Sequence, residues 1–399
     1  MPNNNMPNNN TPKDTVLSNV VGYQEVVDSQ KALLKTGTDF SEHKGQVANT
    51  IAKLHPKRLQ LIITGVVENT PSTKTLRVEA VDGRTLPPFL AGQYINIFSK
   101  VKGTDTARPY AVSSSPADLS YYDLTIKRAT PGFVTHHLLD EVKVGDKITS
   151  TGPMGTFYHN PIFHGDELVF LAGGSGIAPA MTMIRDIADH KKSQRFHLIY
   201  LSSYENDVIF EEELKALNAK HDFLTIHNII SRPTPAYEGL SGRLTTHQLK
   251  ELLGEGAPNE RMYFICGPTP FNESCKQQLN ELNVKSRRIR IEANGPPKNP
   301  EALEQWPQGL KPAAEVTVTI RGQGSFQARV DEPLLNSMER NGYSAENACR
   351  SGECSLCRVK VVKGSVLNPP EAHLRKTDAQ YGWCHSCVAF PTEDIEIIV

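Results

Sequence analysis

Three cysteines lie close together near the end of this 399-residue chain, in the stretch ACRSGECSLCRV. Cys349, Cys354 and Cys357 follow the spacing C-x4-C-x2-C, and Cys384 and Cys387 come later. Cysteine thiolates bind zinc ions and the iron of iron–sulfur clusters. Five of the seven cysteines lie in the last fifty-one residues, which indicates a metal site in a reducing compartment instead of a disulfide framework.

The cysteine spacing favours an iron–sulfur cluster over a structural zinc ion. Structural zinc sites usually take their ligands in two close pairs, whereas this pattern has a close triplet and one distant partner. The segments CRSGECSLC and CVAFPTEDIEI resemble the cluster loop and closing strand of plant-type ferredoxins. The resemblance implies a 2Fe-2S cluster held by Cys349, Cys354, Cys357 and Cys387, because the family's fourth ligand directly precedes the closing strand. Two alternatives remain. Cys384 could be the fourth ligand, since it forms C-x2-C with Cys387, and the site could be a zinc knuckle.

A second segment with residues for cofactor chemistry is ARPYAVSSSP, at residues 107–116. It resembles the Arg-x-Tyr-Ser/Thr signature of the ferredoxin reductase superfamily, which lies on a flavin-binding barrel. The resemblance implies that Arg108 pairs with the flavin phosphate and that the ring of Tyr110 lies against the flavin, with FAD expected more than FMN. Ala111 stands where that family has Ser or Thr, so either its amide alone meets the flavin N5 or the hydride step is tuned differently.

A helix start follows in the stretch TPGFVTHHLL. Free amides and the positive end of a helix dipole attract phosphate at such a position. By itself the pattern is an ordinary helix N-terminus, and its place in the family frame favours a phosphate site. The predicted flavin-binding residues are Arg108, Pro109, Tyr110, Ala111, Val112, Lys127, Gly132, Phe133, Val134 and Thr135.

Two further stretches, FLAGGSGIAPAM at 170–181 and FICGP at 264–268, each combine an apolar strand with a glycine turn. The carboxyl ends of parallel strands form one edge of a sheet, where such folds bind ligands. In the superfamily these are the two nicotinamide loops, which implies that Cys266 lies beside the nicotinamide; by itself this cysteine would be a buried core thiol. The predicted nicotinamide-binding residues are Gly173, Gly174, Ser175, Gly176, Cys266, Gly267 and Pro268.

The superfamily commonly places Glu-x-Phe after its closing strand, and here Glu292 is followed by Asn294 in place of the aromatic residue. The resemblance implies catalytic roles for Tyr110, Cys266 and Glu292. A 2'-phosphate needs a cation, and Ser203 stands where family members often have arginine. This favours NADH, although Arg232 leaves NADPH open.

The pattern of the chain divides it into segments that position these residues. Residues 56–158 alternate apolar and polar residues, which predicts an antiparallel β-barrel or sandwich, and the resemblance implies the barrel. Residues 159–293 alternate strands and helices, which predicts a parallel α/β sheet. A proline-rich linker at 294–312 precedes an α+β ferredoxin domain of the β-grasp type at 313–399. The N-terminal extension, 1–55, begins with a predicted disordered tail at 1–14, and its sequence indicates no function.

The charge and hydropathy of the chain exclude several partners. It has 43 Lys plus Arg against 44 Asp plus Glu, a net charge of -1, so no overall field attracts nucleic acid or anionic lipid. No apolar run is long enough to span a bilayer, and the N-terminal residues do not show the charged-then-apolar pattern of a secretory leader. We therefore expect a cytoplasmic protein with no nucleic-acid partner and no membrane span.

The order barrel, nicotinamide domain, ferredoxin resembles single-chain reductases that serve oxygenases, the phenylacetyl-CoA epoxidase complex or hybrid-cluster protein. The resemblance implies an enzyme that takes a hydride from NADH onto flavin and passes single electrons through a 2Fe-2S cluster to a protein acceptor, whose identity the sequence does not predict. Two alternatives stay open: a stand-alone flavin or ferric reductase, and a redox-sensing regulatory protein.

Overall fold

The computed structural model describes residues 21–36, 46–54, 56–130, 132–254, 256–292, 295–370 and 372–399. The chain divides into a small unit, Met1–Lys53, and a large unit, Leu54–Val399. The helix-permissive extension forms α1 (Tyr23–Thr36) and α2 (Gln46–Leu54). The tail predicted at 1–14 lies outside the described residues. Within these ranges no helix has the length and apolar character that a bilayer crossing requires.

The first part of the large unit is a six-stranded antiparallel sheet with the strand order β4-β3-β6-β1-β2-β5. Its apolar positions alternate, so that Leu61 and Ile63 are buried while their neighbours face outward. A bridge between Val112 and Leu124 joins the two edges and closes the sheet into the predicted barrel. The elements are β1 (Leu59–Thr70), β2 (Thr73–Ala80), β3 (Tyr94–Val101), β4 (Thr104–Ala111), β5 (Tyr122–Lys127), α3 (Val134–Asp140) and β6 (Lys147–Ser150).

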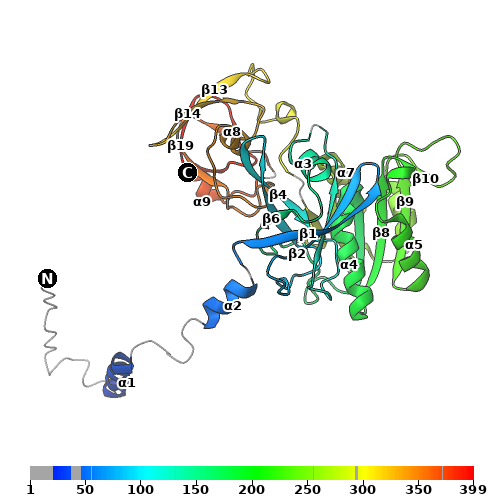
Figure 1. Ribbon diagram of the computed structural model, residues 1–399, viewed down its shortest axis with the longest axis horizontal. Helices are drawn as coiled ribbons and strands as arrows, with labels where there is room; N and C mark the ends of the chain where they lie inside the picture. The colour runs from blue at the N-terminus through cyan, green and yellow to red at the C-terminus, as the bar shows by residue number, and fades with distance from the viewer. Residues whose placement is uncertain are drawn as a thin grey trace, which may run out of the picture. The chain divides into compact units, whose positions relative to one another are not determined.

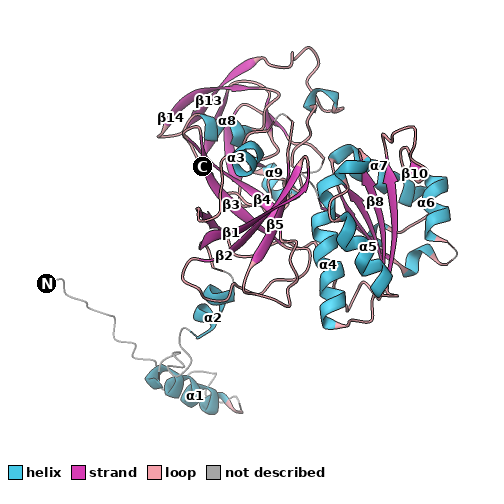
Figure 2. Cartoon of the chain, turned by 45° about the vertical axis from the view of Figure 1, so that its right-hand side comes forward, coloured by secondary structure: helices cyan, strands magenta, loops and turns pink. Residues whose placement is uncertain are grey.

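The second part is a parallel sheet with the order β10-β9-β8-β7-β11-β12 and helices on both faces (Figures 1 and 2). The strand order reverses between β7 and β11, so the carboxyl ends of these two strands form the topological switch point where such sheets bind ligands. The elements are β7 (Glu167–Gly173), α4 (Ile177–His190), β8 (Arg195–Ser202), α5 (Glu211–Lys220), β9 (Leu224–Ile230), β10 (Leu240–Ser241), α6 (Thr246–Leu253), β11 (Met262–Cys266), α7 (Thr269–Glu281) and β12 (Ile289–Glu292).

The third part is a five-stranded mixed sheet with the order β14-β13-β19-β15-β17. The segment AEVTVTIRGQGSFQARV forms the hairpin of β13 and β14, and β13 pairs in parallel with β19, as a β-grasp fold requires. Leu334, Leu335 and Met338 of α8 pack on this sheet. The elements are β13 (Glu315–Ile320), β14 (Gly324–Arg329), α8 (Leu334–Arg340), β15 (Arg358–Lys363), β16 (Val366–Leu367), α9 (Lys376–Gln380), β17 (Trp383–His385), β18 (Phe390–Pro391) and β19 (Ile395–Ile398).

Each of the three sheets has its own hydrophobic core, with a separate buried cluster on either face of the parallel sheet. This confirms the predicted multidomain organisation. The exact domain limits, at 158/159, 293/294 and 312/313, remain predictions.

Candidate functional site

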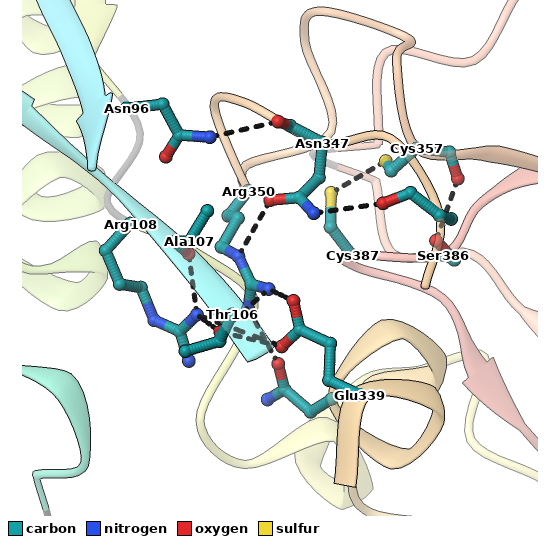
Figure 3. A network of polar contacts seen from close by, with 12 residues as sticks. Asn96, Thr106, Ala107, Arg108, Glu339, Asn347, Arg350, Cys357, Ser386 and Cys387 are labelled. Carbon is teal, nitrogen blue, oxygen red and sulfur yellow. Dashed lines mark hydrogen bonds and ion pairs between the residues drawn. The ribbon is translucent and has the colours of Figure 1, made fainter. Parts of the chain in front are cut away.

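The predicted cluster cysteines lie in an irregular loop between α8 and β15, and the fourth lies just after β17. Their sulfur atoms meet in two pairs. The Cys357 and Cys387 sulfur atoms are 3.1 Å apart (Figure 3). The thiol of Cys354 hydrogen-bonds to Cys349, whose pKa this bond lowers. The structure therefore brings together all four thiols predicted to bind the cluster.

Backbone amides of the loop point at one of these sulfur atoms. The amides of Ser351 and Cys354 donate to the Cys349 sulfur at 3.4 and 3.3 Å. Arg350 and Ser355 adopt positive φ angles of 54° and 59°, which curl the loop so that the amides face inward. Amides directed at sulfur stabilise the negative charge of thiolate ligands.

The arrangement of the thiols fits a cluster with two irons. A structural zinc ion needs four ligands around one point, whereas these thiols meet as two separate pairs. Two separate thiol pairs match two irons that each take two cysteine ligands. Cys384 is buried on β17 and belongs to neither pair, and its burial raises its pKa to about 12. The geometry supports Cys387 as the fourth ligand, and this assignment remains a prediction.

The flavin segment lies at the end of β4. The hydroxyl of Tyr110 is buried and has no hydrogen-bond partner among the described residues, and burial raises its pKa. Arg108 is partly buried, and one of its nitrogen atoms donates to the Thr106 hydroxyl at 2.6 Å and to the Ala107 carbonyl at 2.7 Å. Burial, followed by the neighbouring Arg350 guanidinium, lowers the pKa of Arg108 to about 10. The unpartnered hydroxyl of Tyr110 is compatible with a bound flavin, and the incompletely neutralised charge of Arg108 is compatible with the flavin phosphate.

The other predicted flavin residues have different surroundings. Pro109 and Ala111 alternate with Arg108 and Tyr110 along β4, and Val112 forms the bridge that closes the barrel. A Cβ atom at Gly132 would lie 2.5 Å from the Ala129 carbonyl, so only glycine fits in this turn. Phe133 is the residue before α3, and Val134 is its first, buried residue.

Two predicted flavin residues are held by other protein groups. The hydroxyl of Thr135 accepts a hydrogen bond from the Ala129 amide at 3.2 Å. Lys127 pairs with Asp207 of the nicotinamide domain at 2.5 Å. A side chain at Gly174 would lie 3.6 Å from the Lys127 nitrogen. Lys127 therefore lies at the boundary between the barrel and the nicotinamide loop.

The two nicotinamide loops are pressed against each other at the switch point of the parallel sheet. A Cβ atom at Gly176 would lie 1.8 Å from the carbonyl oxygen of Cys266, and one at Gly267 would lie 2.4 Å from the Phe271 ring. Both positions therefore require glycine. Gly173 ends β7, Gly174 and the exposed Ser175 begin the following turn, and Pro268 directly precedes α7.

The predicted catalytic pair at the edge of the sheet lies on neighbouring strands. Cys266 is opposite Glu292 in the parallel pairing of β11 and β12, and Cys266 is buried. The pKa of Glu292 is raised well above its ordinary value by burial first, then by the charges of Glu353 and Cys349. The edge of the nicotinamide domain therefore lies close to the cluster loop. Asn294, the predicted departure from the family, lies outside the described residues.

The sequence did not reveal the residues through which the cluster loop contacts the barrel. Tyr94 of β3 packs against Ala348 and Cys349. The side-chain amide of Asn96 donates to the Asn347 carbonyl at 2.9 Å (Figure 3). These contacts join residues about 250 positions apart, and no local pattern identifies either partner.

Three family models match successive parts of the chain. An oxidoreductase FAD-binding domain matches residues 61–159, an oxidoreductase NAD-binding domain matches residues 170–277, and a 2Fe-2S iron-sulfur cluster binding domain matches residues 318–392. These matches coincide with the three sheets and with the three predicted cofactor sites.

The chain is 30% identical to the glycine betaine monooxygenase reductase subunit of Pseudomonas aeruginosa over 77% of its own length and 87% of that protein. It is 29% identical to NADH oxidoreductase HCR of Escherichia coli over 85% of its length and 97% of that protein. The chain thus belongs to the family of single-chain reductases that join an FAD-binding, an NAD-binding and a 2Fe-2S domain.

The structure of phthalate dioxygenase reductase has the same fold. It is 20% identical, with a TM-score of 0.62 over 86% of this chain and 97% of that one. The predicted resemblance, fold class, enzyme class and cofactor classes are therefore confirmed.

Proposed function

We propose that this reductase takes electrons from NADH and delivers them one at a time to a partner redox protein. The observation that carries the proposal is the contact between the cluster loop and the barrel strands that bear the flavin segment. Asn96 of β3 binds Asn347, and Thr106 of β4 donates to Glu339 at 2.9 Å. The predicted flavin and cluster sites thus lie on either side of one interface.

When bound, FAD would take a hydride, which is two electrons and one proton, from NADH, and a 2Fe-2S cluster would carry the electrons onward singly. The protein residues position these groups. Arg108 would hold the flavin phosphate, and the Tyr110 ring would lie against the flavin. Cys349, Cys354, Cys357 and Cys387 would hold the cluster.

The nicotinamide loops would bring the substrate to the flavin in a fixed orientation. Gly176 and Gly267 allow the backbone to approach closely, and the amides at the start of α4 would face the pyrophosphate. Buried Cys266 would exclude water from the reacting face. Glu292, whose raised pKa favours its protonated form, would hold a proton at its carboxyl group beside Cys266.

We propose NADH as the substrate because the acidic residues after β8 are arranged against a 2'-phosphate. Glu205 accepts two hydrogen bonds from Thr234, at 2.7 and 2.9 Å, so it is held at this edge. A fixed carboxylate repels an added phosphate. Arg232 donates to the Tyr204 hydroxyl at 3.2 Å. Its guanidinium group is a cation that could pair with the 2'-phosphate of NADPH, the alternative substrate.

The acceptor would be an oxygenase or a hybrid-cluster-type protein. Relatives in this family include the ferredoxin reductase component of 3-ketosteroid-9-alpha-monooxygenase from Rhodococcus rhodochrous and one component of 1,2-phenylacetyl-CoA epoxidase from Escherichia coli. Leu356, next to Cys357, is 45% exposed, so one edge of the cluster loop is open to a partner. The clustering of five of the seven cysteines in the last fifty-one residues, as expected for a metal site in a reducing compartment, supports the proposed cytoplasmic location.

Anaerobic stopped-flow spectroscopy of the purified chain tests this proposal. Addition of NADH should bleach the flavin band first and the cluster band next, and affinity capture under the same conditions should recover an oxygenase or hybrid-cluster-type protein. A protein without FAD and iron would contradict the proposal. Full turnover with flavin or ferric acceptors through the flavin alone would favour a stand-alone reductase, and slow NADH oxidation with every acceptor would favour a sensor.

A further inference from the structure

A buried polar network joins the cluster loop to the flavin strand β4. We call it the interdomain ion network and define it as Thr106 and Arg108 of β4 with Glu339 of α8 and Arg350 of the loop (Figure 3). Glu339 and Arg350 form an ion pair whose side chains are only 6% and 7% exposed. The Thr106 hydroxyl donates to Glu339 at 2.9 Å and accepts from Arg108 at 2.6 Å.

The charges in this network do not balance. Arg108 and Arg350 are both cations, and Glu339, 4.0 Å from Arg108, is the carboxylate that acts on both. The network therefore carries a net charge of one positive unit. Arg108, which is expected to hold the flavin phosphate, is one of its two cations. Without Glu339, the buried guanidinium group of Arg350 and the partly buried one of Arg108 would face each other across the interface, and their repulsion would push the loop away from β4.

The network also fixes the loop that holds the cluster. Arg350 directly follows Cys349 in the chain and donates to Asn347 at 3.2 Å and to Asn336 of α8 at 3.0 Å. Asn347 in turn is bound by Asn96 of the barrel. The backbone on the N-terminal side of Cys349 is thus held to both domains, and movement of Arg350 would move a predicted iron ligand.

We propose that Glu339 and Arg350 are positioning residues for electron transfer from the flavin to the cluster, an inference that depends on the function proposed above. In each step one electron moves from the reduced flavin to one ferric ion, and no bond of the protein forms or breaks. Because such transfer slows steeply with distance, the ion pair affects its rate by fixing the separation of the two sites. A buried ion pair adds little net stability compared with apolar packing, but it can specify one geometry.

Substitution of Glu339→Gln in the full holoenzyme tests the proposal. The rate of cluster reduction after flavin reduction should fall about tenfold, since a charge-assisted contact is lost. Iron content should not change, because none of the four predicted cysteine ligands is replaced. Amide hydrogen exchange over residues 334–350 should become faster. The control Glu396→Gln breaks an ion pair with Arg321 inside the ferredoxin domain, at 2.6 Å. It should change neither the rate of cluster reduction nor the rate of amide hydrogen exchange over residues 334–350.

A double-substitution cycle separates a shared geometry from independent damage. The variant Glu339→Gln with Arg350→Gln should be no slower than either single variant, because both remove the same contact. Thr106→Val is a second variant for the case that the Glu339 variants do not fold, because it leaves the ferredoxin domain intact. It should slow the same step. An unchanged rate of cluster reduction in these variants would overturn the inference. So would a double variant whose fold-loss in rate is the product of the fold-losses of the two single variants. Flavin reduction by NADH followed by cluster reduction in the unaltered protein would still support the proposed function.

Discussion

The barrel meets its two neighbouring domains through surfaces of different chemistry. Towards the nicotinamide domain, Thr182 and Arg185 donate to the backbone carbonyls of Ser114 and Ser113 at 2.6 and 2.5 Å, and Lys127 pairs with Asp207. Towards the ferredoxin domain, the contacts depend on Glu339 shared between two arginines. The first surface is balanced in charge and the second is not. The comparison teaches that the second surface depends more strongly on charge.

The largest expected effect is at the cluster itself, on the ferredoxin side. Cys387→Ser should remove essentially all iron and labile sulfide, because one of the two thiol pairs loses a member, while FAD content is retained. Metal analysis and the absorption spectrum of the purified protein measure this. Cys384→Ser is the matched control, three residues away, and should keep its cluster. Loss of iron in the control instead of Cys387→Ser would reverse the assignment of the fourth ligand.

A large effect is also expected at the nicotinamide loops. In Gly176→Ala the new methyl group would meet the Cys266 carbonyl at 1.8 Å, so the two loops must separate. Flavin reduction by NADH should slow about a hundredfold, as for other misplaced reacting groups. Stopped-flow measurement at saturating NADH gives this rate. Gly65→Ala has its nearest neighbour at 3.4 Å and should react normally. A normal rate for Gly176→Ala would contradict the steric argument.

A moderate effect is expected for the ion pair on the nicotinamide side. Burial raises the pKa of Asp207, but hydrogen bonds from Lys127, Ser72 and Thr70 outweigh it and lower the net value below 3.8. The folded state therefore gains stability above the unfolded pKa and loses it as the pH falls through the lower folded pKa. Asp207→Asn should reduce the free energy of unfolding by about 2 kcal/mol at pH 7.

Denaturant unfolding from pH 7 to pH 3 measures this difference. The gap between Asp207→Asn and the unaltered protein should narrow below pH 3.8. Asp82→Asn breaks a fully exposed pair with Arg84 and should have no measurable effect at any pH. A gap that stays constant with pH would show that the Asp207 charge is not what stabilises this surface.

The smallest effect is expected from a single neutral hydrogen bond on the ferredoxin side. Asn96→Ala removes the donor to Asn347 and should weaken the contact by about 1 kcal/mol, slowing cluster reduction about threefold. Asn69→Ala, which removes a bond to Thr75 inside the barrel at 2.7 Å, is the control. A loss as large as that of Glu339→Gln would mean that the ferredoxin-side surface does not depend mainly on charge.

The sequence predicted most of the fold because the regular elements have clear periodicity. The strands of the parallel sheet and the ferredoxin hairpin form where the apolar patterns place them. The strand β4 was not predicted, since TDTARPYA lacks alternation and contains Pro109. Proline is tolerated there because β4 ends the strand order of its sheet. Four of the residues predicted to bind flavin, Arg108, Pro109, Tyr110 and Ala111, thus lie on the barrel strand that periodicity does not reveal.

The predicted site residues were found by local motifs, and the contacts between domains were not. Glu339 lies in PLLNSMERN, where it has the pattern of an ordinary helical carboxylate, yet it binds Thr106, which is 233 positions away. Nothing in either segment indicates the other. The pairing of the thiols was also beyond the sequence, because the spacing and the family resemblance indicate the ligands without showing which ones meet.

The ferredoxin domain follows the nicotinamide domain in the chain, but its cluster loop hydrogen-bonds to the barrel. The covalent order of the domains is therefore different from the order in which electrons would visit them. Since the docking surface is formed by side chains and not by the connecting segment, a gene in which the ferredoxin module is moved in front of the barrel should encode a protein with the same interface. Rearranged fusions of these three modules are thus compatible with one path for electrons.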